Sequence, residues 1–103
     1  MANLFITEFD SADTPSGGVC VPVARAYGYV EQTPVAIAGA SAQSAAFAAE
    51  TTLVRIHAAG ICSIAFGPNP TATTSTMRLA ADQTEYFSVP AGQSWKVAVI
   101  LNT

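Results

Sequence analysis

Charged residues are scarce in this chain. They make up 11% of its 103 residues, with four Lys or Arg, seven Asp or Glu and a formal net charge of −3, whereas an average soluble domain has about 25%. Duplex DNA and anionic membranes are bound through clustered Lys and Arg. The few, scattered basic residues argue against both, and we expect no direct nucleic-acid binding and no membrane partner.

Residues that carry metal or redox chemistry are also few. Cys20 and Cys62 form no C-x-x-C pair, and the single His57 cannot complete a zinc-finger pattern. Each cysteine lies in an apolar stretch, V-C-V or I-C-S-I, which favours two buried free thiols over a Cys20–Cys62 disulfide. Asp10 and Asp13 supply too few oxygens for calcium and indicate a solvated loop. We expect no metal and no cofactor.

The usual signs of export and of membrane insertion are missing as well. No basic residue precedes Arg25, and Glu8 interrupts the first apolar run, so the start of the chain does not follow the signal-peptide pattern. Two long stretches without formal charge, 32–49 and 56–77, contain many polar residues and do not predict a membrane span. We expect a soluble protein that is synthesised in a cytoplasm.

What is present is a chain that is 50% hydrophobic and otherwise dominated by small uncharged residues. A surface of Ala, Ser, Thr, Gln and Asn costs little to desolvate, because burying a charge is far more unfavourable than burying an alanine or a hydrogen-bonded threonine. This composition favours coverage of much of the surface by other subunits or by a partner. The alternative is an ordinary exterior that happens to be rich in Ala and Thr.

Short apolar runs separated by turn residues predict one all-β domain over residues 1–103, an antiparallel β-sandwich of jelly-roll type with about eight short strands. Gly60 lies between two of these runs and predicts an antiparallel hairpin. Residues 39–50 are rich in Ala, which suits a helix, but we favour an extended or loop conformation. The expected strands are 4–9, 19–24, 26–32, 34–38, 51–58, 61–67, 77–80, 85–89 and 94–101.

No arrangement of residues predicts catalysis. His57 lies in an alternating strand beside Arg55, and the chain has no G-x-S-x-G nucleophile motif. We therefore expect His57 on a solvent or interface face, and no enzymatic activity. Tyr86 and Phe87 are neighbours in a strand, so their side chains face opposite ways, and tyrosine is the better candidate for an interface.

The order of segments in the second half of the chain resembles a known group of proteins. It runs T-T-L-V-R-I-H-A, then I-C-S-I-A-F-G-P-N-P-T-A-T-T-S-T-M-R-L, then T-E-Y-F-S-V-P-A-G-Q and W-K-V-A-V-I. This order is similar to that of small virion proteins of tailed bacteriophages, in particular capsid decoration (cement) proteins with jelly-roll-like folds. The resemblance covers about half of the chain and includes no catalytic motif.

The resemblance implies a non-enzymatic protein of the virion, synthesised in the bacterial host cytoplasm and bound to the outside of the capsid. Its partner would be the major capsid protein, whose subunit junctions it would stabilise. It would also associate with itself, as a homodimer on the base rate of oligomer symmetry and as a trimer otherwise. The candidate partner contacts are Leu4, Phe5, Ile6 and Tyr86.

Three alternatives remain open at the level of the sequence. The segment 4–9 is either an arm added to a neighbouring subunit or an ordinary first strand. The chain could be a tail, baseplate or fibre component instead of a head protein. A small ligand- or glycan-binding β module using Trp95 or the tyrosines is the alternative from another class.

Overall fold

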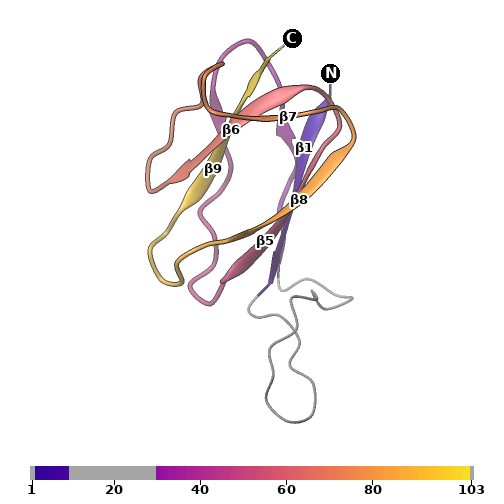
Figure 1. Cartoon of the computed structure of the whole chain (residues 1–103). Helices are drawn as coiled ribbons and strands as arrows, with labels where there is room; N and C mark the ends of the chain where they lie inside the picture. Colours follow the sequence, from indigo (N-terminus) through magenta and orange to yellow (C-terminus); the bar gives the residue numbers. More distant parts are fainter. Residues whose placement is uncertain (1, 10–29, 103) are drawn as a thin grey trace.

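The computed structural model describes residues 2–9 and 30–102, which form two facing antiparallel β-sheets without any helix (Figure 1). The predicted all-β sandwich is therefore confirmed. Two expected strands, 19–24 and most of 26–32, lie outside the described residues. The observed strands are β1 (Asn3–Phe9), β2 (Val30–Glu31), β3 (Val35–Ala36), β4 (Ala42–Gln43), β5 (Leu53–Ala58), β6 (Cys62–Gly67), β7 (Met77–Leu79), β8 (Gln83–Ser88) and β9 (Lys96–Leu101).

The strand order is that of a jelly roll. One sheet has the order β2-β1-β5-β8, with β3 also paired to β1, and the other has the order β4-β9-β6-β7. From β3 onward every connection crosses between the sheets except that from β6 to β7, because β3, β5 and β8 belong to the first sheet and β4, β6, β7 and β9 to the second. β1 takes the place, between β3 and β5, that the last strand occupies in an ordinary jelly roll.

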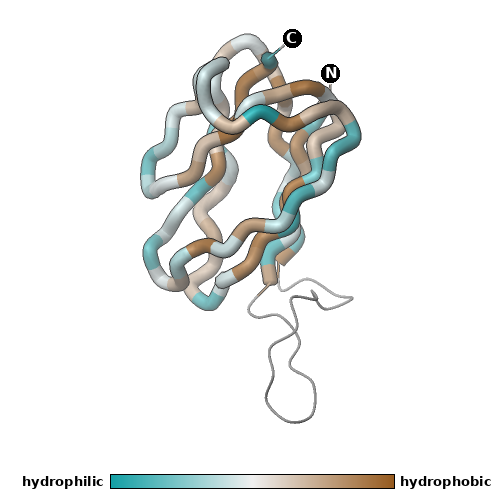
Figure 2. Tube along the Cα trace, in the orientation of Figure 1, coloured by the Kyte–Doolittle hydropathy of each residue, from teal (hydrophilic) through white to brown (hydrophobic). Residues whose placement is uncertain are grey.

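The core lies between the sheets and is built by side chains of alternate residues. Figure 2 shows apolar residues recurring along the strands between more polar ones. β5 has the clearest pattern, since Val54, Ile56 and Ala58 are buried and the residues between them are half-buried. The predicted alternation is confirmed here. The buried core cluster is Leu4, Ile6, Ile37, Phe47, Val54, Ile56, Ala58, Cys62, Ile64, Leu79, Val89, Val97 and Val99.

The predicted hairpin around Gly60 is wrong. β5 pairs with β1 and β8, whereas β6 pairs with β7 and β9, so Gly60 carries the chain from one sheet to the other. A Cβ atom at Gly60 would lie 2.8 Å from the Cβ of Ala2. Gly60 is therefore needed because the connection between β5 and β6 packs closely against Ala2. Strand periodicity identifies an apolar face in each run but does not say whether two runs share a sheet.

The Ala-rich segment 39–50 contains β4 and no helix, which confirms the extended or loop prediction. Hydrogen bonds to the last strand region hold it, because Ser44 N donates to Val97 O (2.8 Å) and Phe47 N donates to Trp95 O (2.8 Å). The helix propensity of alanine is a small term, and pairing with a neighbouring strand outweighs it.

Candidate functional site

The outer face of the five-stranded sheet is the main candidate for a binding surface. The register of β1, β5 and β8 places Phe5, His57 and Thr84 in one row across the strands and Thr7, Arg55 and Tyr86 in the next. These residues alternate with the core residues of the same strands, so their side chains point away from the other sheet. We call this surface the open face; it consists of Phe5, Arg55, His57, Thr84 and Tyr86, whereas Thr7 and Phe9 on the same side of β1 are buried.

Two large apolar side chains are exposed on the open face. Phe5 is 41% exposed and Tyr86 is 53% exposed. Removing apolar area from water is favourable by roughly 25 cal/mol per Å², before the costs of association are subtracted, and tyrosine is enriched in interfaces. Because Arg55 and His57 lie between these two side chains, the open face combines aromatic area with a few polar groups, as protein-binding surfaces do.

His57 joins the strands of the open face. Its ring lies 6.2 Å from that of Phe5, and its Nδ1 is 2.7 Å from Thr84 Oγ1. Asp82 Oδ1 is 4.0 Å from the other ring nitrogen, Nε2. The order threonine, histidine, aspartate resembles that of a catalytic triad, but 4.0 Å is too long for the hydrogen bond that orients the base. The arrangement is that of a cross-strand polar contact, and the open-face position predicted for His57 is confirmed.

The outer face of the four-stranded sheet is covered, in contrast, by the chain itself. Ser63 and Ala98 point away from the core, yet both are fully buried. The loop 68–76, between β6 and β7, is hydrogen-bonded to two residues beside them, since Gln43 is the register partner of Ala98 and Asn102 also bonds Ser63. Gln43 Nε2 donates to Asn69 Oδ1 (2.9 Å) and to Pro70 O (2.8 Å).

Two further contacts hold the same loop. Ala72 N donates to Ser41 Oγ (2.9 Å), and Ala72 is itself buried. Asn102 Nδ2 donates to Ser63 Oγ (2.7 Å) and to Thr74 O (3.2 Å), which links the sheet to the loop. Of the two outer faces in the described part of the molecule, the open face is thus the one that this loop leaves free.

The structure divides the four candidate partner contacts into two pairs. Leu4 and Ile6 are 0% and 1% exposed, so their side chains belong to the core, which corrects the expectation for these two residues. β1 pairs with β5 on one side and with β2 and β3 on the other, as an ordinary interior strand instead of an arm. Only Phe5 and Tyr86 present side chains that a partner can reach.

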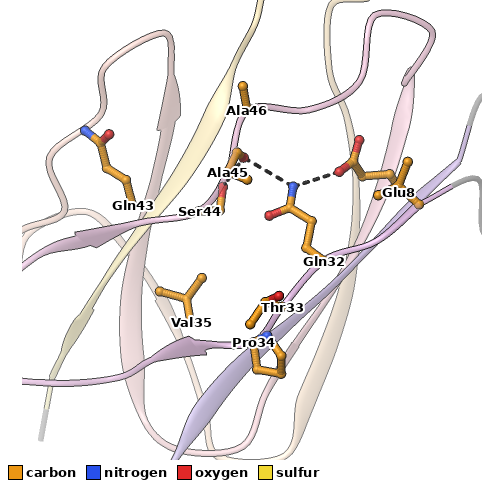
Figure 3. A pocket seen from close by; sticks show the side chains of 10 residues that line it. Glu8, Gln32, Thr33, Pro34, Val35, Gln43, Ser44, Ala45 and Ala46 are labelled. Atoms are coloured by element: carbon orange, nitrogen blue, oxygen red, sulfur yellow. Dashed lines mark hydrogen bonds between the residues drawn. The ribbon is translucent and has the colours of Figure 1, made fainter.

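A buried carboxylate joins the two sheets on the side of β2, β3 and β4 (Figure 3). Glu8 is 1% exposed, and its Oε1 accepts hydrogen bonds from Thr51 Oγ1 (2.6 Å) and Ala48 N (2.8 Å). Its Oε2 accepts one from Gln32 Nε2 (2.7 Å), which also donates to Ala45 O (3.2 Å). Both side-chain oxygens of Glu8 therefore have hydrogen-bond partners, as buried polar atoms require.

Sequence reasoning missed this cluster, although a signal existed. Leu4, Ile6 and Glu8 occupy alternate positions of one strand, so Glu8 lies on the core face. Beside the cluster is an open pocket of about 460 Å³, into which the carboxamide of Gln32 projects (Figure 3). Gln32 Oε1 is buried and accepts no hydrogen bond from the described residues. The pocket is lined by Glu8, Val30, Gln32, Thr33, Pro34, Val35, Gln43, Ser44, Ala45 and Ala46.

The other residues considered from the sequence have structural settings. Cys62 is a buried free thiol, and burial raises the pKa of this thiol, so it packs as a small hydrophobe. Trp95 is half-buried against the core. Within residues 2–9 and 30–102, no three His, Cys, Asp or Glu side chains gather where they could hold a metal ion. The same residues contain no helix long and apolar enough to cross a membrane. Cys20, Asp10 and Asp13 lie outside the described residues.

No protein-family model matches the chain, and neither the curated proteins nor the solved structures include a significant match.

Proposed function

We propose that this chain is a non-enzymatic structural protein of a virion that binds the outside of a tailed-phage capsid and stabilises the junctions between subunits of the major capsid protein. It reaches this location after synthesis in the bacterial host cytoplasm. It acts as a homo-oligomer, with a dimer preferred to a trimer. The alternative is a location in the tail, baseplate or fibre, which differs in copy number and partner and is equally non-enzymatic.

The observation that carries this proposal is the difference between the two outer faces. The open face exposes Phe5 and Tyr86, whereas the loop 68–76 buries Ser63 and Ala98 on the opposite side. A protein that attaches to a lattice needs a surface that is inexpensive to desolvate on one side and a rigid body behind it. Few charges and a continuous core meet these two requirements.

Repetition explains how a modest surface can suffice. Each copy would offer one open face, and weak contacts repeated through linked copies give strong total attachment through avidity. The resemblance of the second half of the chain to decoration proteins supports the same conclusion. No comparable observation supports glycan binding, because Trp95 contributes to the core and offers only part of its ring.

Capsid binding by purified variants tests the proposal. Capsids prepared without this protein are mixed with increasing amounts of the wild-type chain, and bound copies are counted after sedimentation. We expect saturable binding that Phe5→Thr weakens at least tenfold, because the open face loses an exposed ring from a strand position that threonine suits. Phe5 lies on β1, away from the β8 edge, so this change reports on the open face alone.

Met77→Thr is the matched control. Met77 is 51% exposed, comparable to Phe5, but it lies on β7 of the other sheet. We expect it to bind capsids as the wild type does. Absence of saturable binding by the wild type would contradict the capsid proposal. Equal loss of binding in the two variants would contradict the assignment to the open face.

A further inference from the structure

The edges of the two sheets differ in length. β2, β3 and β4 have two residues each, and β7 has three, whereas β8 is an edge strand of six residues, Gln83–Ser88. Native proteins protect long edges with proline, lysine, bulges or very short strands, because an unprotected edge pairs with another strand. β8 has no proline and no lysine, and its only charged residue is Glu85. Among the described strands it is the edge best suited to pairing.

The backbone groups that β8 leaves free are defined by its register with β5. Val89 N donates to Thr52 O (3.0 Å), and Phe87 lies opposite Val54 two residues earlier. In an antiparallel pair the hydrogen-bonded positions recur at every second residue. The N–H and C=O groups of Thr84, Tyr86 and Ser88 therefore point away from β5, toward the open edge.

This alternation limits how β8 can pair with a second copy of itself across a two-fold axis. Positions with outward backbone groups must face each other. One possible register is centred on Glu85 and pairs most of the strand. It places the Glu85 carboxylates of the two copies directly opposite each other, which is unfavourable. The register centred on Tyr86 pairs as much of the strand, places Thr84 opposite Ser88 of the second copy, and separates the carboxylates.

We infer that β8 pairs antiparallel with β8 of a second copy of this chain, with Tyr86 on the two-fold axis, and so joins the two five-stranded sheets into one. Tyr86 lies next to Tyr86 of the second copy on the outer side of the sheet. The two open faces become continuous, with one Phe5 on each side of the axis. The inference rests on the self-association proposed above and is independent of the capsid.

Charge substitution at the axis tests this interface specifically, because few other interfaces would give the same pattern of dissociation and recovery. A residue on a two-fold axis faces itself, so Tyr86→Lys and Tyr86→Glu each place two like charges opposite one another. We expect each variant alone to dissociate at least tenfold more readily than the wild type. An equimolar mixture of the two restores the dimer as a heterodimer, because unlike charges opposite each other are favourable. Sedimentation velocity of the whole chain over a concentration series measures this.

A second variant tests the backbone without changing charge. Ser88→Pro removes an N–H that points away from β5, so the domain keeps its own sheet while the dimer loses a hydrogen bond at each end. We expect weaker dimerisation with an unchanged circular dichroism spectrum. Met77→Lys, at an equally exposed position on β7, should leave the dimer intact.

The outcomes separate this inference from the function. A wild-type chain that remains monomeric at all concentrations overturns the self-association, although capsid binding as a monomer would leave the proposed function in place. A dimer that is insensitive to Tyr86→Lys and Ser88→Pro overturns the assignment to β8. Dissociation of both charge variants without recovery in the mixture overturns the position of the axis.

Discussion

The two sheets of this sandwich share one core but use their outer faces differently. The four-stranded sheet carries the loop 68–76, which accepts hydrogen bonds from Gln43 and Asn102 and donates one to Ser41 Oγ. The five-stranded sheet leaves Phe5 and Tyr86 exposed. Both faces arise from strands with the same alternation, so the difference comes from where a long polar connection folds back. The chain itself thereby buries Ser63 and Ala98 on one outer face and leaves Phe5 and Tyr86 exposed on the other.

The largest expected effect comes from placing a charge under the loop. Ala98 is fully buried on the outer side of β9, so Ala98→Asp forces either an unpaired buried carboxylate or displacement of the loop. We expect the free energy of unfolding in urea to fall by about 3–5 kcal/mol. Ala36→Asp, at an exposed position on the outer side of β3 in the five-stranded sheet, should change it by less than about 0.5 kcal/mol. Equal losses in the free energy of unfolding would show that the two outer faces tolerate a charge equally, which would contradict the comparison.

A smaller loss is expected where the two sheets are joined by Glu8. Glu8→Gln keeps the shape of the side chain but places an NH₂ group opposite one of two N–H donors, Ala48 N or Gln32 Nε2. We expect a loss of about 2 kcal/mol, since a buried donor is left without an acceptor. Thermal and urea unfolding measure this loss.

Glu31→Gln is the matched control for the buried carboxylate. Glu31 is exposed on β2 and accepts one hydrogen bond from Thr7 Oγ1 (3.0 Å). Its neutralisation should alter stability by less than about 0.5 kcal/mol. If the two variants lost the same stability, the Glu8 cluster would not be what holds this side of the sandwich.

The smallest effect is expected from releasing the loop without burying a charge. Gln43→Ala removes the hydrogen bonds to Asn69 and Pro70. We expect a loss of about 1 kcal/mol and faster amide hydrogen exchange within 68–76, with the core strands unchanged. Gln93→Ala, at an exposed turn position, serves as the control and should exchange as the wild type does. Unchanged exchange in Gln43→Ala would mean that other contacts alone hold the loop.

Much of the fold could be predicted because alternation is a local property. The alternating pattern of 51–58 predicted His57 on a solvent or interface face, and Val54 and Ile56, on the other face of this strand, are buried. The same rule identified Tyr86 as exposed and Phe87 as packed against the core. These results depend only on neighbouring residues of one strand.

Strand partners could not be predicted, because they depend on contacts between distant segments. Gly60 was read as a hairpin turn, although it separates strands of different sheets. The coverage of Ala98 by 68–76 and the bonding of Glu8 to Thr51 likewise join residues far apart in sequence. Leu4 and Ile6 were grouped with Phe5 as partner contacts, although alternation along β1 separates them from it.

The most direct test of the central claim is the copy number of this chain in purified virions of the tailed phage that the proposed function implies, measured by quantitative mass spectrometry against the major capsid protein. We predict a copy number comparable to that of the major capsid protein, as expected for a protein that occupies repeated sites on the capsid. A handful of copies per virion would move it to the tail or baseplate. Complete absence from virions would contradict the proposed function.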